Sequence, residues 1–149
     1  MSFALSKWEE RFMSMARLVA TWSRDPSSKV GTVIVDRRKR IVSVGFNGFP
    51  AGVDDTIVSR EQKLLRTIHA EGNAILFAQR DLAGCTIYVS HPPCSQCAAL
   101  IVQSGITRVV SPIPTPDFAS RWKDHCDEAL TMFAEAGVQV VQFEDVCSV

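Results

Sequence analysis

The sequence predicts an α/β protein with a mixed five-stranded sheet and helices on both of its faces. Apolar, β-rich runs alternate along the chain with segments of helical periodicity. A helical crossover separates the last two strand runs, at 108–111 and 138–143, and connections of that length join parallel strands. The runs at 30–35 and 41–46 are close enough to form a hairpin. We therefore expect a sheet that is antiparallel at its hairpin edge and parallel elsewhere.

The first element is an amphipathic helix at residues 3–24, because large apolar side chains recur there at intervals of three and four residues. These side chains are Trp8, Phe12, Met15, Val19 and Trp22. We expect this stripe to face the core. The polar segment 36–40 then connects the two strands of the hairpin, and its basic residues are expected to face solvent.

A loop rich in glycine and proline follows at residues 45–52, and this composition suits a close approach of the backbone to a ligand. The later elements alternate between helix and strand. They are expected at residues 69–80 (helix), 86–90 (strand), 94–104 (helix), 108–111 (strand), 120–136 (helix) and 138–143 (strand). Gly137 ends the last helix as a C-terminal stop.

The composition favours one catalytic domain with a small-molecule ligand. A chain of 149 residues fits a single domain, which we expect to span 1–149. The formal net charge is zero and the basic residues are scattered, which argues against a stable nucleic-acid partner. No stretch has the length and apolarity of a membrane span, and the N-terminal residues lack the pattern of a signal peptide. We therefore expect a cytoplasmic protein without a membrane partner.

Two short segments carry metal-competent side chains at predicted helix starts. His69 and Glu71 open one helix, and Cys94 and Cys97, preceded by Pro93, open the next. The two cysteines are three residues apart, so they lie on one helix face and reach one ion, and the helix N-terminus favours their thiolate forms. His69 supplies a third ligand. Three protein ligands with one open position are typical of a catalytic zinc site, and Glu71 is placed to transfer protons beside it.

Two other interpretations of these residues stay open. A closed structural zinc site needs a fourth ligand, for which Cys85 and His91 are nearby candidates without a matching pair spacing. A thioredoxin-like redox pair of Cys94 and Cys97 leaves His69 without a role. The cysteines outside the pair are expected to be small buried or incidental residues, and they are Cys85, Cys126 and Cys147.

The pattern His-x-Glu followed by Pro-Cys-x-x-Cys matches the signature of zinc-dependent base deaminases. Four runs extend the match over nearly the whole chain: KVGTVIVD at 29–36, GFNGFP at 45–50, HAEGNAI at 69–75 and SGI at 104–106. Together these runs resemble the deoxycytidylate (dCMP) deaminase family, and the Asn-Gly-Phe-Pro loop points to that branch. The resemblance implies a cytidine-deaminase-like three-layer α/β/α sandwich.

The resemblance also implies roles for individual residues. The three ligands hold one catalytic Zn²⁺, and Glu71 shuttles protons. Asn47 contacts the sugar of the nucleotide, and Ala70 offers backbone contacts to the base. A homo-oligomer, hexamer or dimer, is implied as well. Some family members are regulated by nucleoside triphosphates, which would bind with Mg²⁺. Asp25, Lys29 and the Asn47 loop are the candidates for such an effector site.

A nucleotide substrate needs donors for its phosphate, and arginines on loops near helix ends are the candidates. Arg121 follows the 108–111 strand at the carboxyl end of the parallel strands, where α/β proteins commonly bind ligands. Arg80 closes the 69–80 helix at its far end, and a subunit interface is its other possible role. We therefore favour Arg121 as the phosphate contact.

The expected activity is hydrolytic deamination of dCMP to dUMP, which releases ammonia and supplies dUMP for thymidylate synthesis. Zinc lowers the pKa of its bound water, and Glu71 accepts the released proton and passes protons to N3 and to the departing amino group. Deamination of CMP, cytidine or deoxycytidine is the nearest alternative. Deamination of a tRNA adenosine needs a basic surface that the neutral composition does not indicate. A zinc-binding subunit without catalytic activity is a further alternative, but Glu71 would have no function in such a protein.

Overall fold

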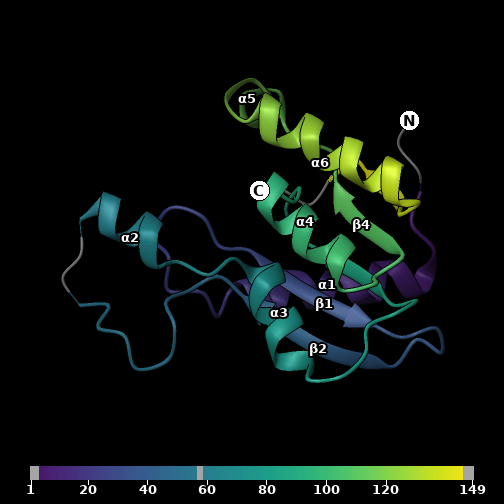
Figure 1. The fold of residues 1–149 in the computed structure, drawn as a ribbon, viewed down its shortest axis with the longest axis horizontal. Helices are drawn as coiled ribbons and strands as arrows, with labels where there is room; N and C mark the ends of the chain where they lie inside the picture. The colour runs from purple at the N-terminus through teal and green to yellow at the C-terminus, as the bar shows by residue number, and fades with distance from the viewer. Residues whose placement is uncertain (1–3, 57–58, 146–149) are drawn as a thin grey trace.

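The fold is built around a five-stranded sheet with the strand order β2-β1-β3-β4-β5 (Figure 1). The computed structural model describes residues 4–56 and 59–145. The strands are β1 (Gly31–Val35), β2 (Ile41–Phe46), β3 (Thr86–Val89), β4 (Arg108–Pro112) and β5 (Gln139–Phe143). The helices are α1 (Lys7–Ala20), α2 (Arg60–Arg66), α3 (Ala70–Ala78), α4 (Ser95–Gln103), α5 (Pro116–Arg121) and α6 (Lys123–Ala136).

The sheet is mixed. β3, β4 and β5 are parallel, which confirms the prediction for the final strands. β1 is antiparallel to both β2 and β3, so the expectation that the sheet is parallel everywhere beyond the hairpin is wrong for one strand pair. The reason is the crossover through α3, which carries the chain from β2 past β1 and makes β3 parallel to β2.

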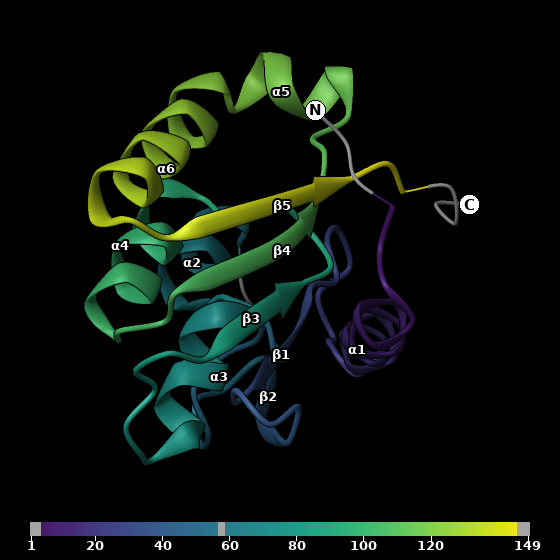
Figure 2. The ribbon, with the colours of Figure 1, turned by 90° about the vertical axis from the view of Figure 1, so that its right-hand side faces the viewer.

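Helices cover both faces of the sheet, as Figure 2 shows in a view along its edge. α1 lies on one face, and α3, α4 and α6 lie on the other. Successive side chains of a strand point to opposite faces. Ile34 and Ile87 accordingly belong to the core beneath α3, α4 and α6, whereas Val33 and Tyr88 belong to the core beneath α1. The predicted three-layer arrangement is confirmed.

α1 is shorter than the predicted 3–24 helix, and of the predicted stripe it buries Phe12 and Val19. Its buried residues are Phe12, Met13, Ala16, Val19 and Ala20. Trp8 and Trp22, which were expected in the core, are 43% and 52% exposed. α1 lies so close to the sheet that a Cβ atom on Gly31 would come within 1.9 Å of the Ala16 carbonyl oxygen. A helix this close leaves no room for an indole ring beneath it.

Two helical segments differ from the prediction. α2 is a helix that the periodicity does not indicate, although Ser59 and Gln62 form a capping box at its start. The helix predicted at 120–136 is two helices, α5 and α6, which meet at the non-helical backbone of Trp122. Pro116 occupies the first turn of α5, so the helical region begins earlier than predicted. In the described part of the chain, no helix is long and apolar enough to cross a membrane.

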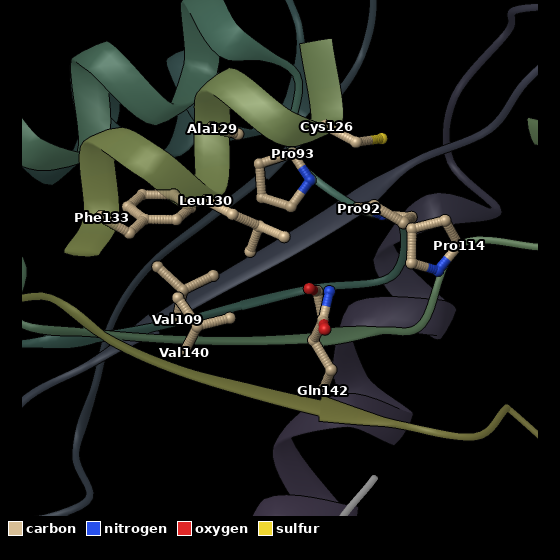
Figure 3. A pocket seen from close by; sticks show the side chains of 11 residues that line it. Pro92, Pro93, Val109, Pro114, Cys126, Ala129, Leu130, Phe133, Val140 and Gln142 are labelled. Atoms are coloured by element: carbon tan, nitrogen blue, oxygen red, sulfur yellow. The ribbon is translucent and has the colours of Figure 1, made fainter. Parts of the chain in front are cut away.

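A small cavity lies between α6 and the strands β4 and β5, and Leu130, Phe133 and Val140 are among the side chains that line it (Figure 3). Its volume of about 20 Å³ admits little more than one water molecule. Sites for small organic ligands typically have several hundred Å³. The cavity therefore belongs to the packing of α6 on the sheet and not to a substrate site.

Candidate metal and active site

Helices α3 and α4 lie next to each other, and each begins at a metal-competent residue. His69 is the N-cap of α3, and Cys94 is the N-cap of α4. Gly48 and Ile68 pair as an isolated antiparallel β-bridge, and His69 follows directly after Ile68. Pro93 precedes Cys94 and keeps the chain extended up to the start of α4. The two predicted motifs therefore meet in space at two helix starts.

Three ligand atoms converge at these helix starts. The Nδ1 atom of His69 lies 3.5 Å from the sulfur of Cys94 and 3.3 Å from the sulfur of Cys97. Neighbouring ligands of a tetrahedral zinc ion, with metal distances of about 2.0 Å for nitrogen and about 2.3 Å for sulfur, are roughly 3.5 Å apart. The three atoms thus fit one zinc ion. Among the side chains that the structure describes, neither Cys85 nor His91 joins this group, so no fourth protein ligand closes the site.

The electrostatics of Cys94 favour metal binding. Hydrogen bonds from Cys97 and from His69 lower the pKa of Cys94 to about 4, so its sulfur is anionic at neutral pH. The backbone N–H of Cys97 also donates to that sulfur at 3.4 Å. Thiolates are the form in which cysteine binds zinc. Cys97 is buried and His69 is exposed, so the site opens to the surface on the His69 side.

Glu71 lies in the first turn of α3 and is only 4% exposed. Burial raises the pKa of its carboxyl group to about 7, and the carboxyl contacts the side chain of Cys97. A group with a pKa near neutrality both accepts and donates protons at that pH. Glu71 does not belong to the group of ligand atoms. The structure thus places it beside the ligands, in a position suited to proton transfer.

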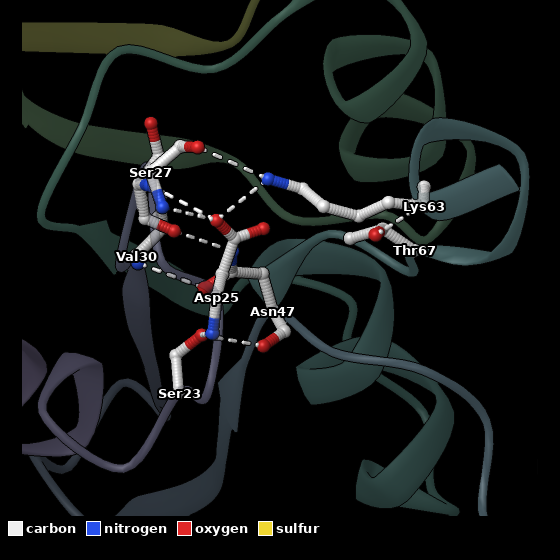
Figure 4. Close-up of polar contacts among 8 residues, drawn as sticks. Ser23, Asp25, Ser27, Val30, Asn47, Lys63 and Thr67 are labelled. Carbon is white, nitrogen blue, oxygen red and sulfur yellow. Dashed lines mark hydrogen bonds and ion pairs between the residues drawn. The ribbon is translucent and has the colours of Figure 1, made fainter. Parts of the chain in front are cut away.

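Asn47 is held by the segment before β1 (Figure 4). Its Oδ1 accepts a hydrogen bond from the backbone N–H of Val30 at 2.9 Å, and its Nδ2 donates to the carbonyl of Ser28 at 2.8 Å. The hydroxyl of Ser23 donates to the Asn47 carbonyl at 2.8 Å. The Asn47 amide therefore has a fixed orientation, and each of its polar atoms keeps the capacity for one further hydrogen bond.

An ion pair ties α2 to the same segment. The Nζ atom of Lys63 lies 2.9 Å from Oδ1 of Asp25, and that oxygen also accepts hydrogen bonds from the backbones of Ser27 and Ser28 (Figure 4). Burial alone would raise the pKa of Asp25, but these hydrogen bonds outweigh it and hold the pKa below its ordinary value of 3.8. The sequence motifs do not reveal Lys63. The capping box at Ser59 is the signal that marks its helix.

Residues 6–112 match the family model of the cytidine and deoxycytidylate deaminase zinc-binding region. This span contains His69, Glu71, Cys94 and Cys97. The chain belongs to the cytidine and deoxycytidylate deaminase family. Because the family model describes a zinc-binding region and the donor set fits that ion, zinc is the metal of the three-ligand site.

Other deaminases are similar to this one over most of its length. An uncharacterised deaminase of Aliivibrio fischeri is 55% identical over 138 aligned positions, which cover 91% of this chain and 93% of that protein. Human deoxycytidylate deaminase is 38% identical over 154 aligned positions, which cover 95% of this chain and 83% of the human protein. The crystal structure of a dCMP deaminase from the cyanophage S-TIM5 superposes with a TM-score of 0.76 at 23% identity, over 95% and 100% of the two chains. The cytidine-deaminase-like fold is confirmed.

The residues predicted to bind phosphate or an effector lie near the surface of this deaminase. Arg121 is the last residue of α5 and not part of a loop, and it forms an exposed ion pair with Asp117 at 2.9 Å. α3 ends before Arg80, because the backbone of Gln79 is left-handed with φ of 50°. Arg80 and Lys29 are exposed, whereas Asp25 is half-buried.

Three of the remaining predicted residues are buried or half-buried in the deaminase. Ala70, at the start of α3, is fully buried. Cys85 is buried and Cys126 is half-buried. Cys147 lies outside the described residues.

Asp25→Asn is expected to destabilise this deaminase by about 1–2 kcal/mol at neutral pH, because a neutral side chain cannot replace the charged partner of Lys63. The pKa of Asp25 is lowered in the fold, so the stabilisation is fully present above the ordinary pKa of 3.8 and disappears as the pH falls through the lowered value. Thermal unfolding of both proteins at several pH values measures the difference. Asp55→Asn is the control, since its partner Arg24 is largely exposed. An equal effect of both variants would contradict the prediction.

Proposed function

We propose that this chain is a hydrolase that deaminates dCMP to dUMP and releases ammonia. The observation that carries this proposal is the buried carboxyl group of Glu71 beside the three ligands His69, Cys94 and Cys97. Hydrolytic deamination of a base needs three metal ligands, an open coordination position and an adjacent acid–base group. The similarity to human deoxycytidylate deaminase supports dCMP as the substrate. The product would then supply thymidylate synthesis.

Glu71 performs the proton transfers of the proposed reaction. A zinc ion held by His69, Cys94 and Cys97 would lower the pKa of a water molecule and so supply a nucleophile near neutral pH. Glu71 accepts a proton from this water and passes it to ring nitrogen N3 while the oxygen forms a bond to C4. It then transfers the second proton of that oxygen to the exocyclic amino group. The bond between C4 and the amino nitrogen breaks, and ammonia and dUMP are released.

Three residues are proposed to hold the substrate. Asn47 contacts the sugar with the hydrogen-bonding capacity that Val30 and Ser28 leave unused. Ala70 offers its backbone to the base from the start of α3. Arg121 binds the phosphate. To do so, its guanidinium group releases the carboxylate of Asp117 and pairs with the phosphate of the substrate instead.

Assembly and regulation form part of the same proposal. Exposed apolar side chains on α2, α3 and α4 support a homo-oligomer, as a hexamer or a dimer. These side chains are Leu64, Leu65, Leu76, Phe77 and Leu100. Asp25, Lys29 and Arg80 are proposed for an effector site or an interface, with Mg²⁺ accompanying a nucleoside triphosphate effector. We propose the cytoplasm as the location of the protein.

A substrate panel tests the proposed activity. Ammonia release is measured with zinc-loaded protein on dCMP, CMP, deoxycytidine and a tRNA hairpin. The proposal requires the highest kcat/KM with dCMP. Equal rates with deoxycytidine would identify a nucleoside enzyme, and turnover of the hairpin alone would identify a nucleic-acid deaminase. The absence of turnover on every substrate would favour a zinc-holding subunit.

Arg121→Ala is expected to lower kcat/KM for dCMP by roughly a hundredfold, because a charged contact to the phosphate is lost. Turnover of deoxycytidine, which has no phosphate, should not change. Asp117→Ala is the matched control, since it removes the ion-pair partner of Arg121 and leaves the guanidinium group in place. A loss in Arg80→Ala without a loss in Arg121→Ala would move the phosphate contact to Arg80.

A further inference from the structure

Thr32 carries an unpartnered hydroxyl group in the interior. Across residues 4–56 and 59–145, its Oγ1 is the one buried side-chain nitrogen or oxygen without a hydrogen-bond partner. The residue is fully buried. Buried polar groups are nearly always hydrogen-bonded, because a missing partner costs the free energy of desolvation. A valine would fill the same volume in β1 at no such cost, so the hydroxyl requires an explanation.

The side chain of Thr32 faces the layer of α3 and α4. Gly31, its neighbour in β1, faces α1, since a Cβ atom there would meet the carbonyl oxygen of Ala16. Side chains alternate along a strand, so Thr32 faces the opposite side. Its partner in β2 is Gly45, at which a Cβ atom would come within 2.4 Å of the Ala70 carbonyl oxygen. Thr32 thus lies next to the strand position on which the first turn of α3 packs.

Thr32 also lies at the end of the sheet that carries the metal ligands. Its partner in β3 is Val89, the last residue of that strand, after which the chain runs to Cys94. α3 packs against β1 and β2 and lies in front of them in Figure 1. The buried carboxyl group of Glu71 belongs to the same first turn of α3 and faces Cys97 of α4. The unpartnered hydroxyl group therefore belongs to the part of the sheet on which the first turn of α3, with Glu71, packs.

We propose that Thr32 is a positioning residue for Glu71 and that one buried water molecule links the two side chains. This inference rests on the proposed function, in which Glu71 carries the protons. A water molecule between them satisfies the Thr32 hydroxyl. A hydroxyl group both donates and accepts, so the link persists whether Glu71 is ionised or protonated. The contact restrains the carboxyl group near the reacting atoms through both proton transfers.

Thr32→Val and Thr32→Ser test this role. Valine keeps the volume and removes the hydroxyl group, so kcat for dCMP should fall by roughly tenfold with little change in KM or zinc content. Serine restores the hydroxyl group and should recover most of the rate. The Tm of Thr32→Val should not exceed that of the wild type. A raised Tm with an unchanged kcat would show that the hydroxyl group has no partner and would overturn the proposal.

Ser43→Ala is the matched control. Ser43 is also nearly buried beneath α3, but its hydroxyl donates to the Ala74 carbonyl at 2.7 Å, one helical turn beyond Ala70. Its loss should lower the Tm and leave kcat unchanged. An equal fall of kcat in Ser43→Ala and Thr32→Val would assign both effects to support of the helix and would overturn the specific role of Thr32.

A stability cycle separates this inference from the proposed function. The Tm is measured for zinc-loaded wild type, Thr32→Val, Glu71→Ala and the double variant. A link between the side chains makes the two changes non-additive, whereas additive changes would overturn the link. The cycle needs no turnover. It therefore decides the Thr32 proposal even if the wild type fails to deaminate dCMP, an outcome that would reject the proposed function alone.

Discussion

Glu71→Gln is expected to retain zinc and to lose a factor of about 100 or more in kcat, the usual contribution of a general acid–base group. Glutamine keeps the shape of the buried side chain, which is 4% exposed, but it cannot carry a proton between water, N3 and the amino group. The three ligands His69, Cys94 and Cys97 are unchanged. Measured on the same preparation, the zinc content should therefore equal that of the wild type, whereas ammonia release from dCMP should fall.

Glu128→Gln is the control for this experiment, because Glu128 is an exposed residue of α6. It should keep both zinc and turnover. If Glu71→Gln retained most of the wild-type kcat, another group would have to move the protons. Loss of zinc from Glu71→Gln would instead indicate that the carboxyl group supports the metal site.

The strands and the helices next to the site are predictable because their signals are local. The apolar runs at 30–35 and 41–46 and the lengths of the later connections are visible in the chain itself, and they predict the β1–β2 hairpin and the parallel direction of the final strands. The antiparallel pairing of β1 with β3 depends on the path of the chain through α3, which these signals do not indicate. The break at Trp122 is different. The residues around this break have partners that are distant in the sequence, because Phe118 packs against the His91 ring and His125 shares a hydrogen bond with Ser95.

The metal ligands are predictable for a chemical reason. One ion needs several donors at short range, so Cys94 and Cys97 must have the spacing of a single helix face, and a helix start is a favourable place for thiolates. Thr32 and Lys63 have no such pattern. A threonine within a β-rich run indicates only a strand, and a lysine in a short polar helix indicates only a surface. The burial of Thr32 beneath the helices and the pairing of Lys63 with Asp25 are set by the fold.

Cys97→Ser is expected to lose both zinc and activity. Cys97 is a buried ligand, 3% exposed, with its sulfur 3.3 Å from Nδ1 of His69. A serine hydroxyl does not ionise near neutral pH and is a poor substitute for a thiolate, so two protein ligands would remain. Metal analysis after dialysis should find little zinc, and ammonia release from dCMP should fall to background.

Thermal unfolding gives a second measurement that does not depend on turnover. A ligand that binds only the folded state raises the Tm in proportion to its binding free energy. The wild type should therefore lose stability when a chelator removes zinc, whereas Cys97→Ser should show nearly the same Tm with and without the chelator. Cys126→Ser is the control, because Cys126 is a half-buried cysteine of α6 outside the ligand group, and it should respond to the chelator as the wild type does. Full zinc occupancy in Cys97→Ser, or a wild-type response to the chelator, would overturn the assignment of Cys97 as a ligand.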